Sequence, residues 1–167
     1  MIIYRDAFTG DEMISDSFPH TLIEDNCAMV VKAKSITISN DCGIASNDEE
    51  DGGPLADGAE TVIDVVHAFR LQECFAFDNK KVFMGYIKKY MTRVKEHLEA
   101  KKPDRVEAFM KGAQNIVKDI VANFGEYRFY TGESYDESAA LAYSKYEEGS
   151  VDPTFLFFLD GMIAEKC

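Results

Sequence analysis

The acidic side chains are the groups in this sequence that could hold a metal ion. Residues 39–61 are rich in Asp, Glu, Gly, Ser and Asn, and they contain the unbroken acidic run Asp48–Asp51. A run of this kind attracts divalent cations loosely, but the chain has no EF-hand loop with its regular acidic spacing and final Glu. We therefore expect weak calcium binding at most, and the sequence leaves its ligands unassigned.

The residues that could act in covalent catalysis form no recognisable constellation. His20, His67 and His97 fall in three different predicted elements, and none shares a motif with a nucleophile. The chain also lacks the glycine-rich phosphate loops, the nucleophile elbow and the HExxH zinc motif. His67 falls on the apolar face of a predicted strand, so we interpret it as a core histidine. These patterns favour a binding protein over an enzyme, and no cofactor is expected to be required.

The four cysteines, Cys27, Cys42, Cys74 and Cys167, are widely spaced and form no Cys-x-x-Cys pair. This spacing argues against a structural zinc site and against a disulfide framework. No signal peptide is visible in the first ten residues, and no apolar run approaches the roughly 20 residues that span a bilayer. We therefore expect a cytoplasmic protein without a membrane span.

The charges of the chain are strongly segregated. Residues 80–118 carry eleven Lys and Arg against four Asp and Glu, whereas the remainder carries seven against 26. The net charge of −12 thus combines a basic segment with a very acidic body. Such acidity argues against a duplex DNA binder, which needs a broad basic surface. The basic segment suits a polyanion, and an acidic filament surface such as the tails of tubulin fits it as well as nucleic acid does.

Periodicity predicts the strands that would position these groups. The segment Met1–Asp6 is short and β-prone, and a turn signal at Thr9–Glu12 follows it. Residues 13–38 alternate in the way that suits antiparallel strands, most clearly at Ala28–Ile38. Residues 62–77 alternate as well and predict another strand, with one apolar face made by Ile63, Val65, His67, Phe69, Leu71, Phe75 and Phe77. Three further strands are predicted at residues 127–131, 141–146 and 154–159.

Two amphipathic helices are predicted between residues 80 and 124. The first, at about 80–100, carries an apolar stripe at spacings of three and four, made by Phe83, Ile87, Tyr90, Val94 and Leu98. Pro103 breaks it, because proline disfavours helix in the residue before it and suits the first turn of the next helix. The second helix, at about 106–124, repeats the same spacing. Together they predict an αα-hairpin.

The predicted fold class is therefore α+β. We expect a single domain over residues 1–167, in which the helical hairpin 80–124 is inserted into a mostly antiparallel β body. Residues 39–61 have few large apolar side chains to offset the entropy of ordering, so they predict a long, mobile, acidic loop.

Four stretches of the sequence resemble the translationally controlled tumour protein (TCTP) family, and together they span nearly the whole chain. They are MIIYRD with the following Asp11–Met13 and Ser15–Asp16, then Tyr86–Met91, Tyr127–Glu133, and Phe157–Gly161 with the terminal Glu165–Cys167. One part departs from the family pattern, because Gly43–Glu50 is shorter and more acidic than the usual loop signature. Phosphorylation of this loop is therefore not carried over to Ser46.

The resemblance implies a twisted β "tent" with a protruding helical hairpin. Structural relatives of the family that act on Rab proteins hold zinc with paired Cys-x-x-Cys motifs, and since this chain has none we expect no zinc. The resemblance also implies a cytosolic protein of growth and cell-survival control. Its expected partners are small GTPases of the Rheb type, microtubules and anti-apoptotic proteins, with no specific nucleic acid. We expect it to be mainly monomeric, and any non-classical secretion is not visible in the sequence.

The resemblance assigns roles to particular residues. The acidic residue that matches Glu12, with Asp11 beside it, is expected to contact the GTPase. The basic hairpin matches the region assigned to microtubules, and the candidates are Lys88, Lys89, Arg93, Lys95, Lys101 and Lys102. Cys167 matches a position that forms disulfide dimers outside the cell. Two alternatives stay open, namely a true guanine nucleotide exchange factor for a Rheb-type GTPase and a calcium-buffering protein.

Overall fold

The computed structural model describes residues 1–39 and 59–166, and within them the strands form three antiparallel sheets. The largest sheet has six strands, in the order β3 (His20–Ile23), β4 (Ala28–Lys32), β10 (Pro153–Phe158), β9 (Ala142–Tyr146), β8 (Arg128–Thr131) and β7 (Gln72–Cys74). The three strands predicted late in the chain are confirmed as β8, β9 and β10, and they are neighbours in this sheet. The predicted segment 28–38 divides into β4 and a separate strand, β5 (Ser35–Ser39).

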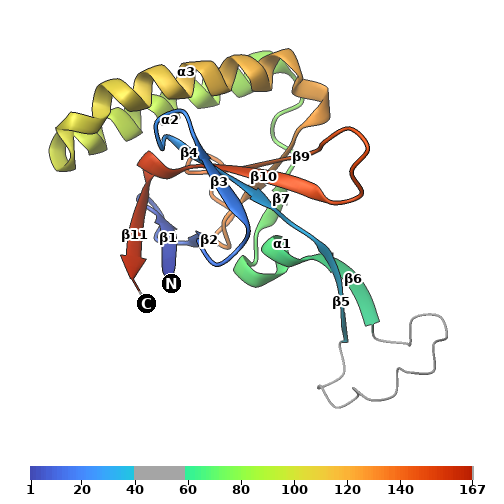
Figure 1. The fold of residues 1–167 in the computed structure, drawn as a ribbon. Coiled ribbons are helices and arrows are strands. Elements are labelled where there is room, and N and C mark those ends of the chain that lie inside the picture. Colours follow the sequence, from blue (N-terminus) through green and yellow to red (C-terminus); the bar gives the residue numbers. More distant parts are fainter. Residues whose placement is uncertain (40–58, 167) are drawn as a thin grey trace.

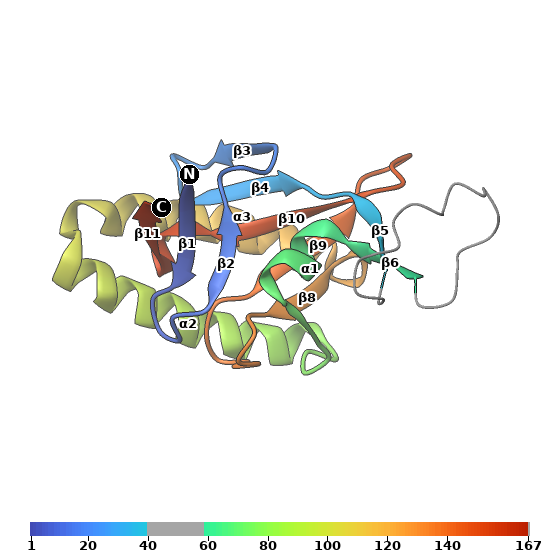
Figure 2. The same ribbon diagram turned by 90° about the horizontal axis from the view of Figure 1, so that it is seen from below.

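The three-stranded sheet joins the two ends of the described chain. Its order is β11 (Met162–Lys166), β1 (Ile2–Asp6) and β2 (Glu12–Ser15), with Ile2 opposite Lys166 and Asp6 opposite Met162. The first and last strands therefore lie side by side, as both ribbon views show (Figures 1 and 2). The predicted first strand is confirmed, whereas β11 was not predicted.

The two predicted helices are confirmed as α2 (Lys80–Lys101) and α3 (Val106–Ala122), joined by a 3₁₀ turn at Pro103–Arg105. The side chain of Asn79 caps α2 by accepting a hydrogen bond from the Val82 N–H at 3.0 Å. The hairpin lies along the six-stranded sheet (Figure 1), and the apolar stripe of α2 from Phe83 to Leu98 is buried there. The ring of Phe83, for example, lies 5.4 Å from that of Phe129 in β8. The resemblance implied a protruding hairpin, but its apolar faces attach it to the body over most of its length.

The strand predicted for residues 62–77 is wrong in its middle. This segment contains the end of β6 (Ala59–Ile63), the short helix α1 (Asp64–Phe69) and β7. The N–H of Arg70 bonds to the His67 carbonyl, and the N–H of Leu71 bonds to the Val66 carbonyl at 3.0 Å, which closes the helix. The helix turns His67 into solvent, so its interpretation as a core histidine is also wrong. Phe75, placed on the apolar face, is 73% exposed.

Strands β5 and β6 form a separate two-stranded ribbon, with Ile36 opposite Val62 and Ser39 opposite Ala59. The ribbon takes in Ser39 and residues 59–61, which the sequence assigned to the acidic loop. The rest of that loop lies outside the described residues, and so do Ser46 and the candidate dimer residue Cys167. Among the described helices, none is long and apolar enough to cross a membrane.

Candidate functional site

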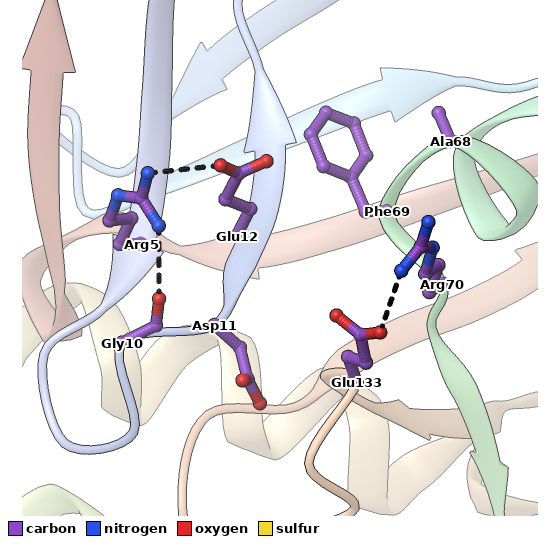
Figure 3. Close-up of a pocket in the computed structure, with 8 residues that line it drawn as sticks. All are labelled: Arg5, Gly10, Asp11, Glu12, Ala68, Phe69, Arg70 and Glu133. Carbon is purple, nitrogen blue, oxygen red and sulfur yellow. Dashed lines mark hydrogen bonds and ion pairs between the residues drawn. The ribbon is translucent and has the colours of Figure 1, made fainter.

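A polar cleft of about 340 Å³ opens at the edge of the three-stranded sheet, beside the turn between β1 and β2 (Figure 3). Its walls come from three places that are distant in sequence, namely the β1–β2 hairpin, the end of α1 and the loop after β8. The residues that line it are Arg5, Gly10, Asp11, Glu12, Ala68, Phe69, Arg70 and Glu133. Both residues expected to contact a GTPase, Asp11 and Glu12, are thus brought to the same cleft.

Glu12 lies on the first wall, where Arg5 holds its carboxylate. The Arg5 Nη2 atom lies 3.0 Å from Glu12 Oε2, and its Nη1 donates to the Gly10 carbonyl at 3.2 Å. Arg5 also pairs with Glu165 of β11 at 3.0 Å, so it joins all three strands of this sheet. The Glu12 side chain nevertheless stays 43% exposed. Its carboxylate is therefore oriented by an internal partner and accessible to an external one.

Asp11 points away from Glu12 and serves the protein itself (Figure 3). Its Oδ2 accepts hydrogen bonds from the Ser134 N–H at 3.1 Å and from the Ser134 hydroxyl at 2.5 Å. Gly132 makes this close approach possible, because a Cβ at that position would lie 2.5 Å from the same oxygen. Asp11 thus fixes the 132–134 loop against the β1–β2 turn, and Glu12 is the better placed of the two for a partner.

The second wall carries another ion pair, between Arg70 and Glu133, which the sequence analysis did not select. The Arg70 Nη1 atom lies 3.0 Å from Glu133 Oε2, and the two side chains are 73% and 57% exposed. Arg70 follows α1, and Glu133 follows β8, so only the fold brings them together. Glu133 does end one of the stretches that resemble the TCTP family, and this was the available signal.

The cleft and its Glu165 neighbour hold four carboxylates against two guanidinium groups, so this part of the surface is acidic overall. At the end of β1, Asp6 is buried and accepts hydrogen bonds from the N–H groups of Phe8 at 2.9 Å and Ala140 at 3.0 Å. Burial raises the pKa of Asp6, and these two N–H donors act in the opposite direction. Asp6 therefore anchors the β1–β2 turn to Ala140 and is not among the residues that line the cleft.

The basic residues predicted on the hairpin fall into two groups. Lys88, Lys89 and Lys95 are exposed on α2, and Lys101 and Lys102 are exposed at its end. Arg93 differs, because its Nη1 donates to the Ser138 carbonyl at 2.9 Å and its guanidinium lies 4.1 Å from the centre of the Phe8 ring. Arg93 therefore attaches the hairpin to the body, while the lysines remain available to a partner.

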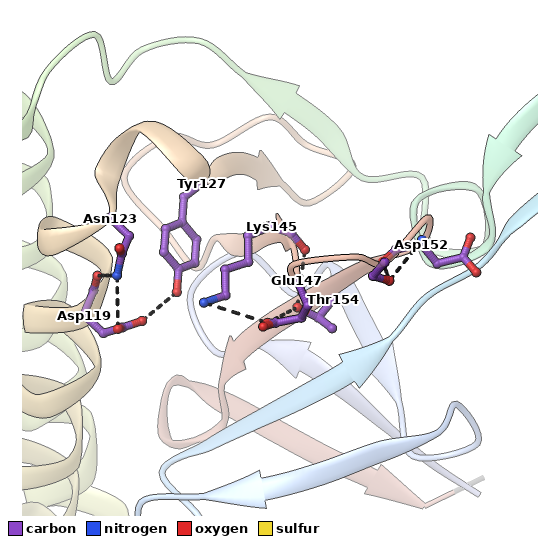
Figure 4. A network of polar contacts seen from close by, with 8 residues as sticks. Asp119, Asn123, Tyr127, Lys145, Glu147, Asp152 and Thr154 are labelled. Atoms are coloured by element: carbon purple, nitrogen blue, oxygen red, sulfur yellow. Dashed lines mark hydrogen bonds and ion pairs between the residues drawn. The ribbon is translucent and has the colours of Figure 1, made fainter.

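A second set of polar contacts connects the end of α3 to the sheet (Figure 4). The Tyr127 hydroxyl donates to Asp119 at 2.9 Å, and Lys145 lies over the Tyr127 ring and 3.8 Å from Glu147. Burial, and then the Asp119 hydrogen bond, raise the pKa of Tyr127. These polar groups have their hydrogen-bond and ion-pair partners within the set, so we interpret their role as structural. Across residues 1–39 and 59–166, no three His, Cys, Asp or Glu side chains are grouped so as to hold a metal ion.

These features define a class of protein, a small α+β body in which a helical hairpin is inserted into a tent of antiparallel strands with a charged cleft at its edge. The chain belongs to the TCTP family, since the family model described as translationally controlled tumour protein matches residues 1–163. The resemblance to the TCTP family and the α+β fold class predicted from the sequence are both confirmed.

Individual relatives agree with this assignment. The chain is 41% identical to a translationally-controlled tumor protein homolog of Debaryomyces hansenii and 42% identical to one of Mycosarcoma maydis, with 99% of each chain covered in both cases. Among solved structures, it is similar to the translationally controlled tumor-associated protein p23fyp of Schizosaccharomyces pombe. That likeness has a TM-score of 0.81, 36% identity and full coverage of both chains.

Proposed function

We propose that this chain is a multi-partner interaction protein of the TCTP type, and that its acidic cleft binds a small GTPase of the Rheb type through Glu12. The observation that supports this most directly is the Glu12 carboxylate, which Arg5 orients while 43% of the side chain stays exposed. A fixed carboxylate in an acidic cleft attracts a basic partner surface and sets its orientation.

Reversing the charge at this position is expected to weaken binding. Glu12→Lys removes the carboxylate and places a cation beside Arg5, so affinity for the GDP-bound GTPase should fall by roughly tenfold or more. Isothermal titration calorimetry measures this directly. Glu107→Lys, which makes the same charge change at an exposed position of α3, is the matched control and should bind like the wild type. Equal affinities of the Glu12 and Glu107 variants would remove Glu12 from the interface.

The wild type and the Glu12→Lys variant also distinguish the two proposed functions, a binding protein and a nucleotide exchange factor. A factor of that kind needs no covalent chemistry, only a surface that destabilises the bound nucleotide and its magnesium ion. Release of fluorescent GDP is measured with the wild type and with Glu12→Lys. Acceleration that is present in the wild type and lost in the variant would establish the exchange alternative, whereas binding without acceleration supports a non-catalytic partner.

The exposed lysines of the hairpin support a second proposed surface, for an acidic polymer such as a microtubule. Lys88 and Lys95 are seven residues apart and thus lie on one face of α2. Replacing both with Glu is expected to reduce co-sedimentation with microtubules by roughly tenfold at low salt, and wild-type binding should weaken as salt shortens the screening length. Lys32→Glu with Lys34→Glu gives the matched control, because both lysines are exposed on the β body. If both double variants lose binding equally, the microtubule responds to the net charge of the protein and not to the lysines of the hairpin.

Other proposals rest on the sequence and on the family resemblance. They are weak calcium binding, binding of anti-apoptotic proteins, a cytoplasmic location, and a disulfide dimer through Cys167, with the monomer as the main form. Calcium buffering stays as an alternative function, and a magnesium competition titration would separate a shaped site from diffuse counterion binding.

A further inference from the structure

The Arg70–Glu133 ion pair stands between two cavities. The first is the cleft that contains Glu12, and the second, of about 630 Å³, is lined by Val62, Val66, His67, Ala68, Arg70, Gln72 and Glu133. Ala68, Arg70 and Glu133 line both of them. The two side chains of the ion pair therefore divide what would otherwise be one groove that passes the end of α1.

Arg70 is held weakly in this position. The described structure gives its side chain one ion pair, with Glu133, and leaves 73% of it exposed. Exposed pairs of this kind contribute little to stability, so they exchange partners readily. Arg5 on the opposite wall differs, because it contacts Glu12, Glu165 and the Gly10 carbonyl together. Of the two arginines, Arg70 is the one that an incoming cation can replace.

The backbone of Arg70 points to the same conclusion. Its φ of 55° and ψ of 42° lie in the left-handed region, which costs an L-residue free energy and which glycine adopts freely. A glycine would close α1 equally well, so the helix end gives no reason for an arginine. What the arginine side chain adds is a cation placed over Glu133.

The second cavity offers apolar contacts beside this pair. Val62, Val66 and Ala68 line it, and Ile36 lies directly opposite Val62 in the β5–β6 register with 38% of its surface exposed. An aliphatic side chain would bury area here, and a basic side chain next to it would reach the carboxylates of the first cavity. The occupant that matches both parts is a segment of a partner protein that carries an Arg or Lys beside an aliphatic residue.

We propose that Arg70 is a built-in competitor that occupies Glu133 in the unbound protein. A basic side chain of the partner displaces it, while the neighbouring aliphatic residue packs against Val62 and Val66. Glu133 thereby becomes a second contact carboxylate, on the wall opposite Glu12. This inference rests on the proposed function, in that the partner is the one that binds the Glu12 cleft. It adds that the protein's own Arg70 limits the affinity of that complex.

Calorimetry with the GDP-bound GTPase tests this with four variants. Arg70→Gly suits the left-handed backbone and frees Glu133, so affinity should rise by up to about fivefold, the upper range for an exposed ion pair. Glu133→Gln should lower affinity by a similar factor. In the double variant Arg70→Gly with Glu133→Gln, the gain should disappear, because the freed carboxylate is no longer there. Val62→Thr keeps the shape of the side chain in β6 but replaces a methyl group with a hydroxyl. It should therefore weaken binding, because the aliphatic residue of the partner would pack against a polar group.

The outcomes separate this inference from the proposed function. If Glu12→Lys weakens binding but Arg70→Gly leaves it unchanged or lowers it, the competitor role is overturned while the Glu12 interface stands. If the wild type does not bind the GTPase, the proposed function fails. A second measurement then tests whether the groove binds a basic and aliphatic peptide in competition with Arg70.

That second measurement titrates the blocked peptide acetyl-Gly-Val-Arg-Val-Gly-amide into isotope-labelled protein and follows backbone amide shifts by NMR. Shifts at Val62, Val66 and Glu133 that saturate at lower peptide concentration in Arg70→Gly than in the wild type would support the groove. Absence of shifts there in both proteins would overturn it.

Discussion

Replacing Arg105 with alanine is expected to lower the free energy of unfolding by about 3 kcal/mol, the cost of leaving a buried charge without its partner. Arg105 lies in the turn between α2 and α3 and binds Asp160 with two parallel hydrogen bonds, from Nε at 2.9 Å and from Nη2 at 2.8 Å. The Asp160 side chain is only 8% exposed. Arg105 also donates to the Asp25 carbonyl at 3.0 Å, so one side chain attaches the hairpin turn to two segments of the β body.

Alanine at position 105 would leave both the Asp160 carboxylate and the Asp25 carbonyl without this donor. The hydrogen bonds to Asp160 raise the pKa of Arg105, which shows the direction of the coupling. Urea unfolding measures the effect. Arg105→Lys keeps the charge without the paired geometry and should give an intermediate value.

Arg128→Ala is the control for loss of a surface cation. Its partner Glu73 lies 4.0 Å away and the Arg128 side chain is 66% exposed, so the cost should stay below about 1 kcal/mol. Similar losses in the Arg105 and Arg128 variants would show that the Asp160 contact does not secure the hairpin.

Arg105 also shows how far the charge pattern of the sequence can be taken. It counts among the eleven cations of residues 80–118, yet it serves the fold, as does Arg93. Composition gives the sign of the net charge of a segment. Which of its cationic side chains are available to a partner depends on contacts with residues distant in sequence. The hairpin itself was predictable, because the apolar stripe of α2 runs from Phe83 to Leu98, about four helical turns, and a long periodic pattern is a strong signal.

Short elements were not predictable in the same way. Helix α1 has six residues, fewer than two turns, and alternation and helical spacing look alike over so short a segment. Its end is marked by Arg70 in a left-handed conformation instead of the glycine that usually signals one. Strand β11 was missed because its residues after Met162 are exposed and show no alternation of burial; pairing with β1 defines it.

The candidate site was predictable only in part. Glu12 and Asp11 were selected because they match positions of a known family, since composition alone gave them no role. The fold then separates them, with Asp11 bound to Ser134 and Glu12 facing the cleft. Arg70 and Glu133 are 63 residues apart, and no local pattern could have paired them.

Gly161→Ala is expected to destabilise the protein by about 3 kcal/mol, at the upper end of the range for overpacking a core. A Cβ at this position would overlap the Tyr90 hydroxyl and would lie 3.1 Å from both the Tyr90 Cζ and the Val94 Cγ2 atoms. The backbone cannot easily withdraw, because the Gly161 carbonyl accepts a hydrogen bond from Ala7 at 3.0 Å. Tyr90 is 1% exposed, so its ring has little room to move either.

Tyr90→Phe supplies the test of this mechanism. Within the described residues the Tyr90 hydroxyl has no hydrogen-bond partner, and burial raises its pKa well above the usual value, so it remains a neutral buried phenol. Removing it should stabilise the protein by about 1 kcal/mol. In the Tyr90→Phe background, Gly161→Ala should cost only about 1 kcal/mol, since the closest contact is gone and the two contacts at 3.1 Å remain.

Urea unfolding of the two single variants, the double variant and the wild type gives the coupling energy directly. A coupling near zero would show that the hydroxyl is not what excludes a side chain at position 161. A coupling of about 2 kcal/mol would show that the glycine is there to admit Tyr90. Asp160 and Gly161 would then act together, because the first binds the hairpin turn through Arg105 and the second lets the middle of α2 pack against the same segment. Strand β11, and with it the Glu165 that contacts Arg5 beside the cleft, would be placed by this junction.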